Sequence, residues 1–474
     1  MVKSKTVYFL LIEIMAFALM VLFNADILVS LIFLLWLWIV WYAFEDINNR
    51  IFLFMFSFSF FNFLLGREIL EHIFKYQIED FSPNVEEHAK IMLLVSLIVF
   101  FISYLIFSKK NFRRDSSEHI TTQYSVSNIM RIRSISLYLY YFAIVIAIIY
   151  NIVIGYFTLV FGYYGSYTDV ALSTIYNNIF VFAIEKVNQM MPVFLALFFA
   201  TVPSYSQTKR VTTLYFIYLM TSLLSGQRAT FVIGLLWIII YYVYRNSTSE
   251  EKWINKQFVV VGVLMLPVAL LLLSLLSQIR EGNGIDSIEI VMGIPNYFYQ
   301  QGVSVNVIKR SYEFASRLNS NHLYSMSVFT DGILGRIFGF TRYAGNSAIH
   351  AQDGYSLAHA LSYVLLGDGY LLGRGTGSSY IAELYHDFKI WGVVIGNIIY
   401  GFVVSRSLTI NANKVYLNAM ALLIIRQILW SPRGGFTDFL LVLLQPFTIL
   451  AFLMVVVLSQ LLKSKYGYRK INNG

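Results

Sequence analysis

Long apolar runs separated by short polar stretches occupy most of the chain. A run of about 20 apolar residues can cross the hydrocarbon core of a bilayer as an α-helix. Twelve such runs lie near residues 7–23, 27–44, 51–65, 91–107, 137–161, 179–200, 212–225, 229–244, 258–277, 390–405, 415–430 and 436–462. This pattern predicts an all-α polytopic membrane protein with about 12 transmembrane helices, forming a single transmembrane domain over residues 1–474.

The composition agrees with a membrane location. Of the 474 residues, 58% are apolar and 13% are charged, whereas soluble domains carry about 25% charged residues. The net charge of +9 does not indicate nucleic-acid binding, because most basic residues lie in short segments beside the ends of the apolar runs. The chain has no cysteine, which excludes disulfides and thiolate metal sites.

The basic residues also predict the orientation in the membrane. If twelve helices alternate in direction, about 20 Lys and Arg residues fall on one side and about five in the short loops of the other. Cytoplasmic loops of membrane proteins carry the excess of Lys and Arg. We therefore expect both termini in the cytoplasm.

One long segment, residues 278–389, interrupts the regular alternation between the ninth and tenth runs, on the external side. It is about a quarter of the chain but holds 14 of the 28 glycines and four of the seven histidines. Because 294–318 and 325–340 are rich in aromatic and aliphatic residues, we expect short amphipathic helices at the outer interface rather than disorder. Such helices are compatible with a lid over a cavity.

Charged residues near the apolar runs mark candidate sites, because a bilayer makes them costly to keep. Arg228 lies in the tight external turn 224–230 between two short runs. Since both flanking helices are short for the bilayer, we expect this turn below the lipid surface, in a water-filled recess. An arginine that extends to the headgroups is the alternative.

A second candidate segment is the glycine-rich stretch 372–387. Its Gly-x-Gly-x-Gly core would let backbone N–H groups approach an anion, but it is a weak nucleotide signature because no strand precedes it. Beyond it, a helix would carry Glu383 and Asp387 four residues apart on one face. We consider Arg374 and Glu383 candidate functional residues. The alternative is a solvated helix start whose acidic residues complement the helix dipole.

Two further places combine charge with an apolar run. Arg426 lies near the external end of the eleventh run, and Arg433 lies in the turn that follows it; either could instead anchor the membrane interface. Glu185 and Lys186 are adjacent within the sixth run. We interpret them as a mutually neutralised structural pair, with an ion relay as the alternative.

The external segment adds arginines that only the fold could bring together. Its charges nearly cancel, with eight Lys and Arg against nine Asp and Glu. The candidates in it are Arg280, Arg310, Arg317, Arg336, Arg342 and His359. Several of them meeting at the outer mouth would form an anion clamp, because a guanidinium group matches phosphate oxygens bidentately. No metal site is expected, since no His-x-x-His or carboxylate cluster with ligand spacing is present.

Two of these segments resemble the bacterial O-antigen and capsular polysaccharide polymerases of the Wzy type. Residues 225–234, Ser-Gly-Gln-Arg-Ala-Thr-Phe-Val-Ile-Gly, are similar to the Gly-x-Arg turn of that family. Residues 373–388, followed by Gly392, are similar to its Gly-x-Gly…Glu-Leu-Tyr…Phe segment after the large external loop. Lys389 departs from the pattern, where a glycine is expected.

The resemblance implies a GT-C-like membrane glycosyltransferase that works without metal or other cofactor on the outer face of the bacterial cytoplasmic membrane. It would transfer a growing glycan from undecaprenyl pyrophosphate to the non-reducing end of one incoming lipid-linked repeat unit. Glu383 would deprotonate the acceptor hydroxyl, with His359 as the second choice. The residues that neutralise pyrophosphate would be Arg228, Arg374, Arg342, Arg426, Arg433 and Arg280.

The implied partners are the undecaprenyl-pyrophosphate-linked oligosaccharide, the bilayer, a flippase and a chain-length regulator, with no nucleic acid. A lipid-linked oligosaccharide flippase is the alternative from another class, because twelve helices with both termini inside suit a transporter. Against it, the chain has no internal repeat and its polar residues of interest lie at the outer face rather than the midplane. A related glycan ligase, which would share carrier and leaving group, is the nearer alternative.

Overall fold

The computed structural model describes residues 4–76, 79–108, 123–226, 228–255, 293–406 and 414–471, with four isolated positions between 255 and 293. Within these ranges the regular structure is entirely helical and no β-strand is present. The single isolated bridge in the described ranges pairs Thr168 with Asn346. The predicted all-α class is therefore confirmed.

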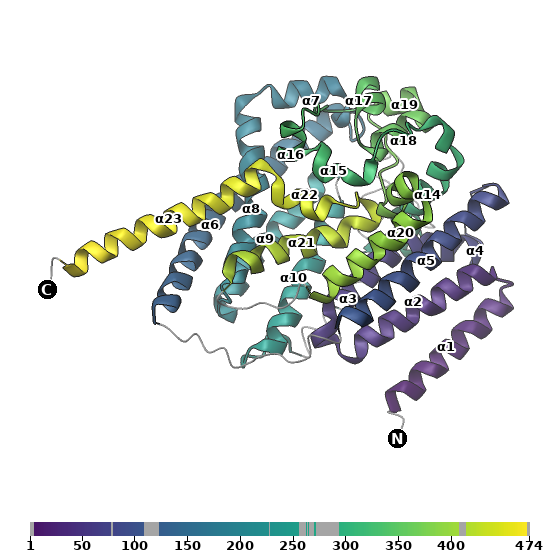
Figure 1. Ribbon diagram of the computed structural model, residues 1–474, viewed down its shortest axis with the longest axis horizontal. Coiled ribbons are helices and arrows are strands. Elements are labelled where there is room, and N and C mark those ends of the chain that lie inside the picture. Colours follow the sequence, from purple (N-terminus) through teal and green to yellow (C-terminus); the bar gives the residue numbers. More distant parts are fainter. Residues whose placement is uncertain are drawn as a thin grey trace.

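The N-terminal helices form one side of the bundle, coloured purple to blue in Figure 1. They are α1 (Ser4–Leu22), α2 (Ile27–Glu45), α3 (Ile47–Phe60), the π-helix η1 (Phe61–Leu65), α4 (Gly66–His72) and α5 (Pro83–Ser108). Asp26 caps α2, since its Oδ1 accepts a hydrogen bond from the backbone N–H of Val29 (3.0 Å). Helices α3 and α4 continue each other through η1, so one long helical span ends in the charged residues of α4.

The central helices are α6 (Gln123–Phe161), η2 (Gly165–Tyr167), α7 (Asp169–Tyr176), α8 (Ile179–Ala200), α9 (Tyr205–Ser222), η3 (Leu223–Ser225) and α10 (Arg228–Thr248). Helix α6 packs along α8 and α9. The turn before α10 depends on Gly226, whose φ of +75° favours glycine. A Cβ on Gly234 would lie 2.4 Å from Leu219 Cδ2, so the absence of a side chain there lets α9 and α10 pack closely.

The described part of the long segment, residues 293–379, consists of short helices, as predicted. They are α13 (Gly293–Gln301), α14 (Ser304–Glu313), η4 (Ala315–Arg317), η5 (Tyr324–Met326), α15 (Ser327–Thr330), α16 (Gly332–Ile337), α17 (Ala348–Asp353), α18 (Leu357–Leu366) and α19 (Asp368–Leu371). Helices α15–α19 gather with α7 at one end of the bundle, at the top of Figure 1. Helix α14 packs against α5 and α20.

The C-terminal helices are α20 (Tyr380–Arg406), α21 (Val415–Trp430), η6 (Ser431–Arg433), α22 (Asp438–Leu444) and α23 (Pro446–Ile471). Helix α20 packs along α5, and α21 lies against α8 and α10. Helices α22 and α23 meet at an angle of 51°, with Pro446 as the first residue after the break. Helix α23 projects from the bundle in Figure 1.

Eleven of the twelve predicted apolar runs coincide with helices, and the ninth, 258–277, falls almost wholly outside the described residues. In the described ranges, eight helices are long and apolar enough to cross a membrane, or nine if α22 and α23 form one broken span. Helices α1 and α9 fall short of that test. Several membrane spans are thus supported, while the number twelve is not confirmed.

Helix α20 is interrupted six residues beyond Glu383. Lys389 has φ +54° and ψ −147°, a backbone conformation that is strained for any residue except glycine. The break also brings Gly392 so close to the Leu384 carbonyl that a Cβ would lie 2.3 Å from the oxygen. The family resemblance leads us to expect a glycine at position 389, and the positive φ explains why a glycine suits this position. Lys389 adopts the same conformation at a cost in conformational free energy.

Replacing Lys389 by glycine should stabilise the protein by about 1 kcal/mol, because it relieves the positive φ. The thermal midpoint of the detergent-solubilised variant, followed by size-exclusion chromatography after heating, checks this. Lys209→Gly, at an exposed position within α9, is the control and should lower the midpoint. A lower midpoint for Lys389→Gly as well would contradict the prediction.

Candidate functional site

The Glu383 carboxylate is buried in the first turn of α20, with only 4% of the residue exposed. Its Oε1 accepts a hydrogen bond from Ser378 Oγ (2.7 Å) and its Oε2 accepts one from the backbone N–H of Phe436 (2.9 Å). The turn that presents Ser378 depends on Gly377, which has φ +76°. Each carboxylate oxygen keeps a lone pair for a further donor.

A second carboxylate, Asp438, lies beside this arrangement. Its Oδ2 accepts from the backbone N–H of Gly435 (2.8 Å), and its Oδ1 accepts from Ser327 Oγ (3.1 Å). The segment 434–438 therefore holds Glu383 through its backbone and adds an acidic group of its own. Sequence reasoning missed Asp438, although it stands only five residues after the candidate Arg433, as the first residue of α22.

Glu383 and Asp438 line a cavity of about 490 Å³, which we call the Glu383 cavity. Four of the predicted site residues line it together: Glu383, His359, Arg342 and Arg433. They come from α20, α18, the loop after α16 and η6, which are far apart in the sequence. The cavity is also lined by Asp331 and His350, so that carboxylates, imidazoles and two guanidinium groups surround one space in which a proton can be moved beside a cation.

His359 enters the Glu383 cavity as part of a packed pair of imidazoles. Its Nδ1 lies 2.9 Å from Tyr370 Oη, and its ring stacks on His350 with 3.6 Å between ring centres. Burial and the neighbouring His350 lower the pKa of His359 to about 3. At neutral pH the ring is therefore uncharged, and a pKa this low makes it a weak proton acceptor.

A second cavity of about 710 Å³ adjoins the first, and we call it the cation cavity. Its basic lining residues are Lys186, Arg336, Arg342 and Arg426. Arg342, which also lines the Glu383 cavity, connects the two spaces, and its side chain is 62% exposed. The apolar wall includes Val442 and Phe447, on either side of the break between α22 and α23.

The cations of this cavity are only partly neutralised. Lys186 Nζ contacts Glu185 Oε2 at 2.5 Å, which is the pair predicted from the sequence. The Nε of Arg426 is buried and has no hydrogen-bond partner among the described residues. No carboxylate from the described part of the chain lines the cavity. The space is therefore suited to an anion.

Arg228 and Arg433 both reach helix α13. Arg228 Nη1 donates to Gln300 Oε1 (3.3 Å), and Arg433 Nη1 donates to the carbonyl of Gln301 (3.2 Å). Burial raises the pKa of Tyr297, on the same helix, to about 12, although both guanidinium groups act to lower it. Arg228 is 9% exposed and lies under α13, and it lines neither of the two cavities.

Arg374 lies on the other side of α18 from Glu383. It lines a third cavity, of about 820 Å³, together with Arg67 and Arg310. We call this the Arg67 cavity. The structure therefore does not place Arg374 in the same cavity as Arg342 and Arg433, with which the sequence analysis had grouped it. Arg280 lies outside the described residues.

Asp387, four residues after Glu383, faces a different partner. Its Oδ1 accepts from the backbone N–H of Tyr324 (3.1 Å), and its Oδ2 accepts from the backbone N–H and Oγ of Ser325 (2.7 and 2.6 Å). It thus fixes the turn before α15 to α20. The two carboxylates expected on one face have separate tasks, and Asp387 holds the external segment in place.

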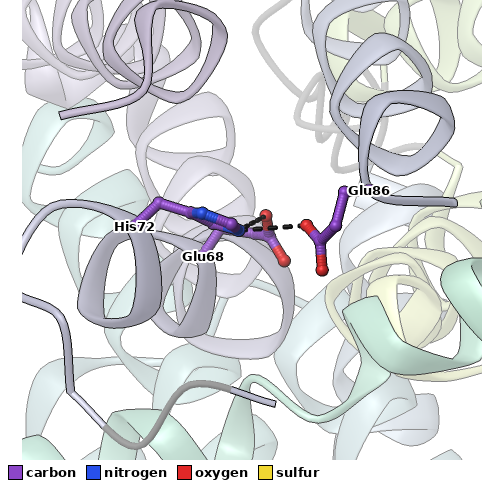
Figure 2. A group of neighbouring side chains, drawn as sticks. All are labelled: Glu68, His72 and Glu86. Atoms are coloured by element: carbon purple, nitrogen blue, oxygen red, sulfur yellow. Dashed lines mark hydrogen bonds and ion pairs between the residues drawn. The ribbon is translucent and has the colours of Figure 1, made fainter. Parts of the chain in front are cut away.

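A buried cluster of charged side chains, which sequence reasoning missed, joins α4, α5 and α14. His72 Nε2 lies 3.0 Å from Glu86 Oε2 and 3.4 Å from Glu68 Oε2, as Figure 2 shows. Ligand atoms of these three residues lie within 4.8 Å of one another, a spacing that could hold a metal ion. Glu68 and His72, four residues apart in a helix, were the available sequence signal.

Lys309 supplies a cation to the same cluster. Its Nζ, fully shielded from solvent, lies 2.6 Å from Glu68 Oε1, 2.9 Å from Glu86 Oε1 and 3.7 Å from Glu71 Oε2. These carboxylates raise the pKa of Lys309, so the amine stays charged despite its burial. An ammonium group therefore already occupies the position between the carboxylates.

Long apolar helices around polar cavities that gather carboxylate and guanidinium groups define a multi-pass membrane protein. The family model for the O-antigen polysaccharide polymerase Wzy matches residues 5–465, so the chain belongs to that family. It polymerises oligosaccharide repeat units into O-antigen. No curated protein and no solved structure matches the chain.

Removal of the Lys309 amine should strongly destabilise the fold. Lys309→Met removes the amine that lies 2.6 Å from Glu68 and 2.9 Å from Glu86, and removing one partner of a buried ion pair typically costs about 3–5 kcal/mol. The thermal midpoint of the solubilised protein should fall by far more than for Lys414→Met, an exposed lysine outside the cluster. Equal midpoints for the two variants would show that the cluster does not hold α14 in place.

Proposed function

We propose that the polymerase joins undecaprenyl-pyrophosphate-linked repeat units in the Glu383 cavity, on the outer face of the cytoplasmic membrane. The observation that carries the proposal is the meeting of Glu383, His359, Arg342 and Arg433 around one cavity that adjoins a cation-lined space. A base and an anion site that share a boundary are what glycosyl transfer from a pyrophosphate requires. The excess of Lys and Arg that the sequence predicts for the short loops of the other side supports this orientation.

In the proposed reaction Glu383 accepts the proton of the acceptor hydroxyl. The hydroxyl oxygen attacks the anomeric carbon of the donor and forms the new glycosidic bond. The bond from that carbon to the phosphate oxygen breaks, and its electron pair leaves with the pyrophosphate. The anomeric carbon is inverted in this single displacement, and detection of a covalent glycosyl-enzyme would count against it.

The cation cavity is the proposed position of the pyrophosphate. Arg336, Arg342 and Arg426 would neutralise the leaving group, and Arg342 would act at the boundary between the two cavities. Guanidinium groups suit this task because they remain charged and bind phosphate oxygens in pairs. The apolar wall formed by Val442 and Phe447 suits the lipid end of the carrier.

We further propose that the transfer needs no metal ion. Arginines can stabilise the developing charge that a metal would otherwise neutralise. Where the described residues bring possible ligands together, at Glu68, His72 and Glu86, Lys309 lies between the carboxylates. His359, which lines the same cavity as Glu383, is the second candidate for the base.

Glu383→Gln should stop polymerisation while the protein level stays normal. Loss of a general base typically slows a reaction about 100-fold to 10,000-fold. A gel of surface glycan from a deletion strain that carries the variant should show material with a single repeat unit. Glu87→Gln, an exposed residue of α5, should leave the full ladder. A normal ladder with Glu383→Gln would exclude Glu383 as the base.

Arg426→Ala should reduce polymer formation about 10-fold to 100-fold, since a hydrogen bond to a charged group contributes about 1.5–3 kcal/mol. Arg426→Lys should retain part of the activity, because the charge remains while the bidentate geometry is lost. Arg317→Ala, in η4 and outside all three cavities, is the control. Equal activity of Arg426→Ala and the control would remove Arg426 from the pyrophosphate site.

A further inference from the structure

The Arg67 cavity is separated from the Glu383 cavity by a thin wall. Helix α18 turns Leu361 and Leu365 toward the Arg67 cavity, while His359 of the same helix lines the Glu383 cavity. The following loop is divided in the same way, with Thr376 on one side and Ser378 on the other. The Arg67 cavity, about 820 Å³, is in the range of about 300–1,000 Å³ that is typical of small-molecule sites.

The polar groups of the Arg67 cavity form a mixed array with Glu79 at its centre. Glu79 Oε2 accepts from Arg67 Nη2 (2.8 Å) and from Asn306 Nδ2 (2.6 Å), and its Oε1 accepts from Arg310 Nη2 (2.8 Å). Arg67 is also held by Glu71, through a hydrogen bond of 2.7 Å from its Nε. Two of the three arginines are therefore already paired with carboxylates.

Asn306 adds an unused acceptor. The residue is 9% exposed and lines the cavity, and its Oδ1 has no hydrogen-bond partner among the described residues. A buried amide oxygen without a donor carries a free-energy cost that a hydroxyl-bearing ligand could relieve.

The opposite wall combines an aromatic ring with a cation. The guanidinium carbon of Arg374 lies 5.4 Å from the centre of the Tyr164 ring. Gly373 makes this approach possible, because a Cβ there would lie 1.8 Å from the Tyr164 carbonyl oxygen, and its φ is +93°. The absence of a side chain at Gly373, in the glycine-rich loop, therefore allows Tyr164 to lie beside the cavity.

We propose that the Arg67 cavity binds sugar rings of the growing glycan, away from the bond that is being formed. The inference rests on the proposed function. Alternating donors and acceptors suit hydroxyl groups, and the Tyr164 ring and leucines of α18 suit the apolar faces of sugars. A pyrophosphate would instead meet the Glu79 carboxylate, whereas no described carboxylate lines the cation cavity.

Retention of the glycan at this site keeps the chain on the enzyme between additions. Loss of the site should therefore shorten the polymer but leave the joining of two repeat units intact. This outcome differs from loss of Glu383, which would leave single repeat units.

The test compares Tyr164→Ala with Tyr163→Ala, its neighbour, which does not line the cavity. Leu365→Trp, which fills the cavity without removing a polar group, is the second variant. Chain length is read from gels of surface glycan, and folding from size-exclusion chromatography. Binding of the delipidated repeat-unit oligosaccharide is measured by calorimetry on the Glu383→Gln protein, with and without Tyr164→Ala.

We expect ladders shifted to shorter chains for Tyr164→Ala and Leu365→Trp, with two-unit products retained and Tyr163→Ala unchanged. Tyr164→Ala should weaken oligosaccharide binding about fivefold to tenfold. Normal chain lengths in both folded variants would overturn the proposal. Competition of the oligosaccharide by inorganic pyrophosphate, or complete loss of polymer with Arg374→Ala but not with Tyr164→Ala, would also overturn it and assign the cavity to the carrier.

Discussion

The segment of short helices, residues 293–379, is tied to the long helices by the amine of Lys309, which lies among the carboxylates of Glu68, Glu71 and Glu86. Each of these charges would be expensive to bury alone, and only their mutual contact makes the burial tolerable. In the described ranges, the ion pairs of this amine are with these three carboxylates. Helix α14 therefore has one position on α4 and α5, and the segments that follow it are built from that position.

The geometry of the polar cavities follows from this anchor. Arg310, next to Lys309, reaches Glu79 and so completes the array of the Arg67 cavity. Helix α13, immediately before α14, provides the carbonyl that holds Arg433 at the mouth of the Glu383 cavity. Asp387 makes the second attachment, from α20 to the turn before α15. The cavity walls contributed by distant parts of the chain thus depend on two buried polar contacts.

Apolar run length was sufficient to predict most helices, because the bilayer requires a spanning segment to satisfy its own backbone. The sequence also made Glu383 a candidate, and the structure brings the candidates His359, Arg342 and Arg433 to the cavity that it lines. The sequence could not indicate that Arg374 lies beyond α18, since that depends on how a loop folds. The sequence also could not indicate the ion pair between Lys309 and Glu86, because the two residues are 223 positions apart. Each of them alone resembles an ordinary charged surface residue.

Helix α18 is a partition that two cavities share, with His359 facing one space and Leu365 the other. The space around Glu383 and the Arg67 cavity therefore have this ten-residue helix as a common wall. A ligand that packs against Leu365 in one space contacts the same helix that presents His359 to the other.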